Sequence, residues 1–374
     1  MVFISVTNDL VADQRVHKIA LSLIKFGNEV TLIGRLRKNS LPINQRPYKT
    51  KRLKLFFDRG IMFYAEYNFH LFFYLLFKKF DILLSNDLDT LPANYLLSVI
   101  RNKTLVYDSH EYFTQVPELI NRKFVQKTWL LIERLILPRI KYSYTVCKSI
   151  AKIYSEKYGI DMKVIRNVPI CNRLRNNPID TKKNTIQPSK FVFPSNKKII
   201  LYQGSVNIGR GIDYMIKAMK HITDAVFVVI GNGDILSDMQ KLVKQSGLEN
   251  KVIFTGRIPF EKLIFYTVRA DIGISLEENT GENYYYALPN KLFDYIQANV
   301  PVIASPLPEI RKIVEGYNIG VIIEKHDPKH IAETIKLMFD NCNQSAWKKN
   351  LTIAAEELCW EKEEKILFEI FSEI

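Results

Sequence analysis

The chain has 374 residues, too long for one ordinary domain, so we expect two domains. Apolar residues make up 47% of the chain and charged residues 25%, which is an ordinary globular balance. The formal net charge of +14 suits nucleic acid, an anionic membrane surface or a diphosphate substrate, and dispersed surface lysine also accounts for it. No nucleic-acid-binding motif occurs, so we expect no nucleic-acid partner.

The cysteines and the N-terminus indicate a cytoplasmic chain. The four cysteines are Cys147, Cys171, Cys342 and Cys359. Their wide spacing, with no CxxC pair, argues against a disulfide framework and against a thiolate zinc site. The first residues lack the basic region and cleavage site of a signal peptide. The longest apolar stretches, 71–77 and 129–137, are far shorter than the ~20 residues that span a bilayer.

The first half of the chain alternates between predicted strands and helices. Apolar runs predict strands at 2–7, 30–33, 81–85, 104–107, 144–147 and 163–165. Helical spacing of apolar residues over 16–24 predicts a helix that Gly27 closes, and a long helix is predicted over 120–140. This order is typical of a doubly wound parallel sheet.

The rhythm breaks at 171–196 and then begins again. This segment carries Pro, Asn and charge without periodicity, which indicates a linker. Strands are then predicted at 199–202, 226–230, 252–254, 272–276, 302–304 and 321–323. Residues 345–374 read as helix with a break near Trp360. We therefore expect domains at 1–170 and 197–357.

The expected fold class is α/β, with two Rossmann-like doubly wound domains facing a cleft. Ligands of such sheets bind at the carboxyl ends of the strands, so the cleft is the expected site. This architecture alone does not name the chemistry.

Two glycine-rich turns follow strands of the second domain. The turn at 204–211 includes Gly204 and Arg210, which suit backbone approach to a ligand and charge on a phosphate. Gly231 begins a second turn of the same design. The first turn does not match the Rossmann or P-loop spacing and is also explained as a tight strand–helix connection. The second has an even stronger ordinary explanation, because Gly-Asn-Gly is a common turn.

Residues 286–295 carry the most informative pattern. Pro289 suits the first turn of a helix, and the N–H groups of Asn290 and Lys291 would then point toward an anion. Asp294, one turn later, is able to reach the two hydroxyls of a ribose. An ordinary capped helix is the alternative.

The first domain has polar residues after two of its predicted strands. His110, in the segment 107–112, is placed to donate to a substrate hydroxyl or to developing charge, although a lone histidine is usually structural. Asp87 and Asp89 have a spacing that suits a divalent metal, but a turn explains them equally, and we expect no metal.

In order along nearly the whole chain, these segments resemble the family 4 glycosyltransferases, which have the GT-B fold. The matching segments are 13–16, 107–111, 164–169, 204–211, 255–257, 288–295 (LPNKLFDY) and 301–305. The resemblance implies a hexosyl or related transfer, with retention of configuration, from a nucleoside diphosphate sugar. It implies no obligatory metal or cofactor, and we expect a UDP- or GDP-linked donor.

The resemblance also implies roles for individual residues. Arg210 matches the basic residue that grips the donor diphosphate, and His110 matches a histidine near the reacting carbon. The remaining donor-side positions are Gly204, Ser205, Gly231, Tyr286, Asn290, Lys291 and Asp294. The acceptor-side positions, in the first domain, are Asn8, Asp13, Arg15, Asp108 and Glu111. The last helix, at about 358–374, is expected to cross back onto the first domain.

The chain departs from the family at its pair of acids. Tyr286 replaces the first acid and Asp294 the second, so the donor sugar does not carry over. Glu278 or Glu282 is a candidate replacement for the first acid. Ser205 replaces an arginine of the turn, and Lys291 is a candidate source of the missing charge.

The acceptor is expected to be a glycan or a lipid-linked glycan in polysaccharide or glycoconjugate synthesis. Residues 51–79 mix basic and aromatic side chains, which favours a peripheral site on an anionic inner membrane surface. A helix packed on its own sheet, with a solvated basic edge, explains the same segment.

Two other functions remain open at this point. A sugar-nucleotide epimerase of the same fold would need no acceptor. A non-catalytic partner of a transferase would bind nucleotide without transferring sugar, and the altered acid pair is compatible with it.

Overall fold

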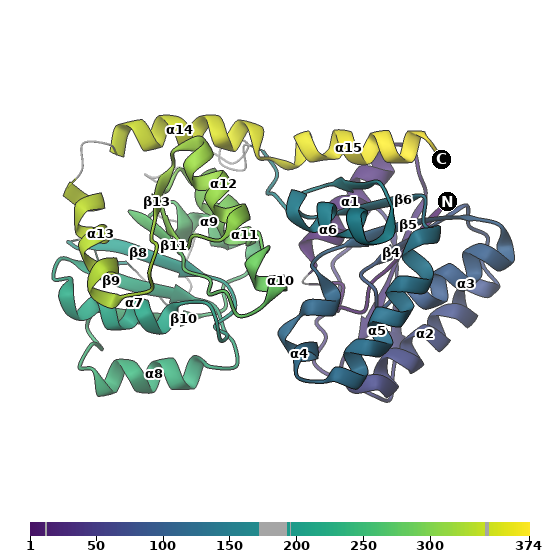
Figure 1. Ribbon diagram of the computed structural model, residues 1–374, viewed down its shortest axis with the longest axis horizontal. Helices are drawn as coiled ribbons and strands as arrows, with labels where there is room; N and C mark the ends of the chain where they lie inside the picture. The colour runs from purple at the N-terminus through teal and green to yellow at the C-terminus, as the bar shows by residue number, and fades with distance from the viewer. Residues whose placement is uncertain (12, 172–192, 195, 341–343) are drawn as a thin grey trace. The chain divides into compact units, whose positions relative to one another are not determined.

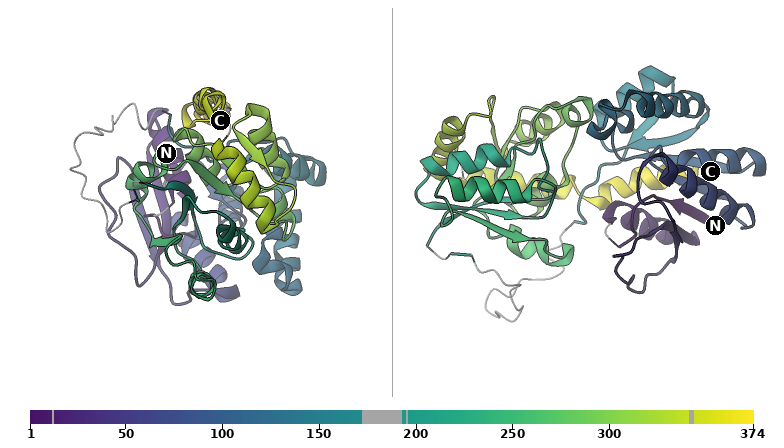
Figure 2. Two further views of the ribbon diagram at one scale, coloured as in Figure 1. Left: turned by 90° about the vertical axis from the view of Figure 1, so that its left-hand side faces the viewer. Right: turned by 90° about the horizontal axis from the view of Figure 1, so that it is seen from below.

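The computed structural model describes residues 1–11, 13–171, 193–194, 196–340 and 344–374, which divide into two compact units. Unit 1 comprises Met1–Asn167, Gly281–Asn283 and Glu363–Ile374, and unit 2 comprises Val168–Thr280 and Tyr284–Lys362 (Figure 1). Cys342 and most of the predicted linker, residues 172–192 and 195, lie outside the described residues. Helices cover both faces of the sheet in each unit (Figure 2).

In the described part of unit 1, seven strands form a parallel sheet in the order β3-β2-β1-β4-β5-β6-β7. The strands are β1 (Val2–Ser5), β2 (Val30–Leu36), β3 (Lys49–Lys54), β4 (Ile82–Asn86), β5 (Thr104–Ser109), β6 (Tyr142–Thr145) and β7 (Met162–Val164). The helices are α1 (Gln14–Lys25), α2 (Gly60–Leu76), α3 (Leu91–Arg101), α4 (Pro117–Ile120), α5 (Lys123–Ile136), α6 (Lys148–Tyr158) and the short η1 (Phe113–Gln115) and η2 (Leu137–Arg139).

The end of the chain belongs to unit 1. The last helix, α15 (Trp360–Ser372), lies beside α1 (Figure 1). The Phe26 and Phe368 rings meet edge to face with their centroids 5.0 Å apart, and Ser22 donates a hydrogen bond of 2.7 Å to Glu364. These contacts attach residues more than 300 positions apart to the same side of the sheet.

In the described part of unit 2, six strands form a second parallel sheet in the order β10-β9-β8-β11-β12-β13. The strands are β8 (Lys198–Gln203), β9 (Ala225–Ile230), β10 (Val252–Gly256), β11 (Ile272–Ser275), β12 (Val302–Ala304) and β13 (Gly320–Ile322). The helices are α7 (Ile212–Ala218), η3 (Met219–His221), α8 (Leu236–Gln245), α9 (Phe260–Thr267), α10 (Glu282–Tyr285, of which the first two residues group with unit 1), α11 (Asn290–Gln297), α12 (Pro308–Tyr317), α13 (Pro328–Asp340) and α14 (Gln344–Glu357).

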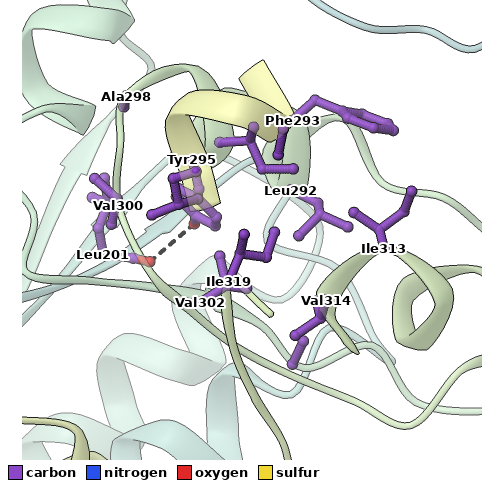
Figure 3. Close-up of a cluster of buried hydrophobic side chains, with 14 of the residues drawn as sticks. Leu201, Leu292, Phe293, Tyr295, Ala298, Val300, Val302, Ile313, Val314 and Ile319 are labelled. Atoms are coloured by element: carbon purple, nitrogen blue, oxygen red, sulfur yellow. Dashed lines mark hydrogen bonds between the residues drawn. The ribbon is translucent and has the colours of Figure 1, made fainter. Parts of the chain in front are cut away.

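Apolar side chains of β8 alternate between two hydrophobic clusters, one on each face of this sheet. Leu201 faces the cluster that contains α9, α11 and α12, whereas Ile200 faces the cluster that contains α7 and α13. Tyr295 lies in the first cluster, where its hydroxyl donates to the Leu201 carbonyl at 2.9 Å (Figure 3). Gly273 lies under the Tyr295 ring, where a Cβ would come within 2.5 Å of ring carbons. The ring therefore fixes α11 against the sheet.

The sequence predicted the alternating strands and helices of both sheets, but some elements differ. The single helix predicted over 120–140 is wrong: the structure has α4, α5 and η2 there, separated at Asn121 and Arg122 and ended near Pro138. The strand predicted at 144–147 lies at Tyr142–Thr145, and β3 was missed because its exposed lysines hide the strand pattern. The break predicted near Trp360 is confirmed, since α14 ends at Glu357 and α15 begins at Trp360.

Among the described residues, no helix is long and apolar enough to cross a membrane.

We predict that Tyr295→Phe lowers the stability of unit 2 by about 1–2 kcal/mol. The substitution keeps the ring but removes the hydroxyl. This hydroxyl donates to the backbone carbonyls of Leu201 and Ile274 and accepts from the backbone N–H of Gln203. Urea unfolding followed by fluorescence measures the change. Tyr285→Phe, at a tyrosine that is 38% exposed, is the matched control and should leave the midpoint unchanged. Equal midpoints for all three proteins would contradict the role given to the hydroxyl.

Candidate active site

In unit 1, polar side chains gather where β4 and β5 end. Asn86 and Asp108 lie opposite one another in the register of these parallel strands. Asp87 follows Asn86 with a left-handed backbone (φ 58°), and His110 follows the end of β5. Neighbouring parallel strands bring their carboxyl ends to one edge, so residues far apart in sequence meet there.

The His110 ring is held from both sides. Its Nδ1 lies 3.2 Å from an Asp87 carboxylate oxygen, and its backbone N–H donates to the other oxygen at 2.8 Å. Its Nε2 lies 3.1 Å from both Asn86 Oδ1 and Asp108 Oδ2. Burial alone would lower the pKa of His110, but the two carboxylates outweigh it and raise the pKa to about 9. The ring is therefore an imidazolium at neutral pH.

A buried arginine, Arg15, binds the Asp108 carboxylate that contacts His110. The Arg15 guanidinium donates to both Asp108 oxygens, at 2.7 and 3.0 Å, and to the Ile165 carbonyl at 2.8 Å. Arg15 is 3% exposed and Asp108 fully buried. Although burial opposes it, Arg15 and then His110 hold the pKa of Asp108 below its ordinary value. The bidentate pair keeps Asp108 ionised and oriented toward His110.

Two further acids of unit 1 have raised pKa values. Burial, helped by the charge of Asp87, raises the pKa of Asp89 to about 8 and that of Glu111 to about 7. One Asp89 oxygen accepts a hydrogen bond from Thr7 at 2.6 Å, and the other is buried without a hydrogen-bond partner. These acids therefore hold or release a proton near neutral pH, which suits contact with sugar hydroxyls.

The structure accounts for the other residues predicted in unit 1. Asp13 caps α1 by accepting from the Val16 N–H at 3.1 Å, and Asn8 donates to Asp13 at 3.2 Å. Asp87 and Asp89 engage different partners, His110 and Thr7, and do not form one of the metal-ligand groups found among the described residues.

In unit 2, the two glycine turns lie against one another. A Cβ on Gly231 would come within 1.8 Å of the Gly204 carbonyl oxygen, and Gly231 has φ +153°. The Gly204 N–H donates to the Ile230 carbonyl at 2.9 Å. Close packing of the backbone therefore requires glycine at 231. Ser205 is exposed in the same turn, and its carbonyl accepts from the Tyr202 hydroxyl at 2.6 Å.

Two buried charges of unit 2, on Glu277 and Lys291, lie close to Arg210 of the first turn. The Lys291 ammonium, 7% exposed, lies 2.5 Å from an oxygen of Glu277, which is fully buried. The Arg210 guanidinium lies 3.9 Å from the same oxygen, and Ser275 donates to the other at 2.7 Å. Burial would raise the pKa of Glu277, but Lys291 and the other neighbours hold it below its ordinary value. Glu277 thus joins the two cations that were predicted separately.

These cations contact rings as well as Glu277. The Lys291 ammonium lies 4.0 Å from the centre of the Tyr202 ring, and the Arg210 guanidinium 4.8 Å from the centre of the Tyr284 ring. Arg210 remains 26% exposed, so its outer side is accessible to an anion.

The α11 helix carries the remaining donor-side predictions. It begins at the exposed Asn290 after Pro289, and no side chain caps its start. The Leu292 N–H donates to the Pro289 carbonyl at 3.1 Å, so Asn290 and Lys291 are the residues whose N–H groups the helix start offers to an anion. One Asp294 oxygen accepts from Gln203 at 2.9 Å, and Gln203 accepts from Thr267 at 2.8 Å. This chain of side chains orients Asp294 at the end of β8.

Tyr286 and the candidate replacement acids have separate surroundings. The Tyr286 ring meets Tyr285 edge to face with centroids 4.9 Å apart. Glu282 lies in Gly281–Asn283, which groups with unit 1. Glu278 lines an open groove of about 550 Å³ between α7 and α8 of unit 2 that also includes Arg210 and Lys217. Neither Lys291 nor Asp294 lines that groove.

Sequence reasoning missed the buried acid at the centre of the cationic pair. Glu277 stands next to Glu278, and residue type alone does not separate the buried acid from the partly exposed one. The available signal was its position two residues after β11, where a strand-end side chain turns inward. The sequence offered Asp87 only as a possible metal ligand or a turn residue, whereas it contacts His110.

We predict that Asp87→Asn lowers the pKa of His110 from about 9 toward its ordinary value. Asparagine tolerates the left-handed backbone but carries no charge. Because folding raises this pKa, the stability that His110 contributes is fully present below about pH 6.5 and is lost as pH rises through about 9. NMR titration of the ring proton measures the shift.

Asp161→Asn, at an acid that is 79% exposed, is the matched control for this titration. It removes one negative charge from unit 1 and should leave the His110 curve in place. An unchanged curve in Asp87→Asn would show that Asp87 does not charge the ring.

We predict that Lys291→Met and Glu277→Gln each destabilise unit 2 by roughly 3–5 kcal/mol, because each leaves a buried charge with less compensation. The double variant should recover much of that loss. Denaturant unfolding of the four proteins measures the coupling. Lys241→Met is the control: its ion pair with Asp238 is 71% and 62% exposed, so we expect a cost below about 1 kcal/mol. If the losses of unfolding free energy in the two single variants simply add in the double variant, Glu277 and Lys291 do not stabilise one another.

Comparison with known proteins identifies both halves of the chain. Residues 12–169 match the family model described as Glycosyltransferase Family 4, and residues 183–352 match the model described as Glycosyl transferases group 1. An uncharacterised glycosyltransferase of Methanocaldococcus jannaschii is 25% identical over 325 residues, which cover 81% of this chain and 78% of that protein.

Solved structures share the fold of this chain. A sucrose-phosphate synthase from Thermosynechococcus elongatus has a TM-score of 0.76 at 16% identity, over all of this chain and 98% of the other. Anabaena HepE, solved in complex with UDP and glucose, has a TM-score of 0.73 at 14% identity, over all of this chain and 99% of the other. The chain therefore belongs to the glycosyltransferases of the group 1 and family 4 type, and it has the GT-B fold.

Proposed function

We propose that this glycosyltransferase transfers a hexosyl or related sugar, with retention, from a UDP- or GDP-linked donor to a glycan or lipid-linked glycan. The observation that carries the donor part is the arrangement of Arg210 and the start of α11 around buried Glu277. Both present positive charge or N–H groups, as a diphosphate requires. HepE, with the same fold, was solved with UDP, which favours a uridine nucleotide.

Within this proposal, the positive charge for the leaving diphosphate comes mainly from Arg210. Lys291 is buried and already paired with Glu277, so its role is to hold that acid and, through it, Arg210. Asp294, held by Gln203, is the candidate partner for ribose hydroxyls. Removing one such preorganised donor typically lowers rate by about 10²–10³.

The proposed transfer step breaks the bond from the anomeric carbon to the diphosphate oxygen. The acceptor oxygen bonds to the same face of that carbon, and its proton passes to the leaving diphosphate. The His110 imidazolium is a candidate hydrogen-bond donor to the donor sugar, and Glu111 and Asp89 to the acceptor hydroxyls. Metal is not needed for this step in the proposal.

We further propose that unit 1 docks on an anionic membrane surface through α2, α3 and α5. The α2 helix buries Phe63, Tyr67, Leu71 and Leu75, yet it is also apolar on its outer side. The three helices, together with Phe77 just after α2, carry large exposed apolar side chains. These are Ile61, Met62, Phe69, Phe73, Phe77, Leu96, Val99, Ile100, Phe124, Leu131 and Leu135. The α3 helix contacts both α2 and α5, so these exposed side chains lie on neighbouring helices. We propose that they form one apolar patch, the kind of surface that marks an interaction site.

Exposed basic residues adjoin Phe77 and Phe124 in sequence. They include Lys78, Lys79, Arg122, Lys123 and Lys127. Aromatic residues beside lysine and arginine are the combination that binds the headgroup region of anionic bilayers. A lipid-linked acceptor would then be presented to unit 1 at that surface.

We predict that UDP or GDP raises the melting temperature of the protein by a few degrees at about 100 times its Kd, a stabilisation of about 2.7 kcal/mol. Arg210→Ala should weaken the same nucleotide by about tenfold or more, because a charged hydrogen bond is lost. Arg311→Ala is the matched control, at 34% side-chain exposure in unit 2 against 26% for Arg210. Equal affinity in all three proteins would refute the donor site.

The reaction products distinguish a transferase from an epimerase and from a non-catalytic partner. Transfer requires an acceptor, whereas conversion of the donor alone would indicate an epimerase. Nucleotide binding with neither reaction would indicate a non-catalytic partner. The anomeric configuration of the product, read by NMR, tests retention.

We predict that the protein floats with vesicles containing anionic lipid and that salt weakens this binding. The triple variant Phe69→Ser, Phe73→Ser, Phe77→Ser should bind several-fold more weakly, since it removes exposed rings and leaves the buried side of α2 unchanged. Leu337→Ser, at a leucine of unit 2 that is 68% exposed, is the control. Equal flotation of the triple variant and wild type would contradict this surface.

A further inference from the structure

We propose that Cys171, Cys359 and Glu361 form a binding site for a soft divalent cation, with Zn²⁺ as the best match. One ligand atom from each residue, two sulfurs and one carboxylate oxygen, lies within 4.8 Å of the other two. Both thiols are unoxidised. The proposal is independent of the transfer reaction proposed above.

The ligand types and their spacing suit zinc. Two thiolates and a carboxylate are ligands that Zn²⁺ accepts, and thiolates select it over Mg²⁺ or Ca²⁺. Sulfurs bound at about 2.3 Å to one ion lie just under 4 Å apart, within the separation that the structure allows. Three protein ligands leave one tetrahedral position for water.

A second set of contacts orients the ligands. The Cys171 N–H donates to Glu361 Oε2 at 2.8 Å, which leaves the other carboxylate oxygen for a cation. The Trp360 N–H donates to the Pro169 carbonyl at 2.8 Å, which joins the two chain segments beside the site. Hydrogen-bonded carboxylates and fixed backbones are typical of metal sites.

The surroundings allow an ion to enter. Cys359 is buried, Cys171 is partly exposed and Glu361 is exposed, so the site opens to solvent through Glu361. Binding of a cation requires both thiols to lose their protons, so we expect the affinity to rise with pH.

The location gives the site a structural consequence. The chain enters unit 2 at Val168 and leaves it after Lys362, so Cys171 and Cys359 lie within four residues of these two crossings. A metal ion would tie the entering segment to the leaving segment, which are 188 positions apart in sequence. Cys171 and Cys359 are far apart in sequence, which argued against a thiolate zinc site, but the fold brings their sulfurs together.

Titration of the reduced, chelator-treated full chain with Co²⁺ tests the proposal. We expect one equivalent to produce a thiolate-to-cobalt charge-transfer band, and Zn²⁺ to displace it. Cys171→Ser and Cys359→Ser should lose the band. Glu361→Gln, at an exposed position, should keep the fold and both thiols and bind about tenfold more weakly or worse.

Cys147→Ser is the control, since Cys147 is a buried cysteine of unit 1 outside the cluster, and its band should equal that of wild type. Circular dichroism of each metal-free variant checks the fold. Absence of the band in wild type, or its persistence in Cys171→Ser and Cys359→Ser, would overturn the proposal. So would a wild-type chain that binds no Co²⁺ but forms a disulfide between 171 and 359 with oxidised glutathione.

Discussion

The Lys291 ammonium and the Glu277 carboxylate are buried together in unit 2, and a charge at that depth is costly unless it is paired. This pair links α11 to the segment after β11 and places Arg210 3.9 Å from the shared oxygen. Lys291 lies at the start of α11 and Arg210 in the first glycine turn, so the shared acid connects these two segments. The donor site therefore rests on a negative charge, although its proposed ligand is itself an anion.

Unit 1 has a similar arrangement, in which acids hold a protonated histidine. Arg15 keeps Asp108 ionised, and Asp108 with Asp87 keeps His110 protonated. A cation at each site is thus held by acids that are themselves buried and hydrogen-bonded. Such preorganised charge needs little rearrangement when charge develops on a reacting group. The cost is a set of buried acids, two of which titrate near neutral pH.

Much of the fold was accessible from the sequence because buried parallel strands are apolar runs, which the pattern around β8 and β9 shows plainly. The resemblance supplied the family. The pairing of Glu277 with Lys291 and of Asp87 with His110 was not accessible, because each depends on how separate elements pack: the end of β11 on α11, and the end of β4 beside the end of β5. β3 was missed because it is an exposed, lysine-rich edge strand, for which periodicity carries little signal.

Hydrogen exchange of backbone amides, with and without saturating UDP or GDP, tests the central claim most directly. A nucleoside diphosphate held by the glycine turn and by the start of α11 should slow exchange over 204–211 and over 290–294. Exchange across α2 and α3 of unit 1 should change far less. Protection confined to other segments, while the nucleotide is bound, would contradict the donor site built on Glu277, Lys291 and Arg210.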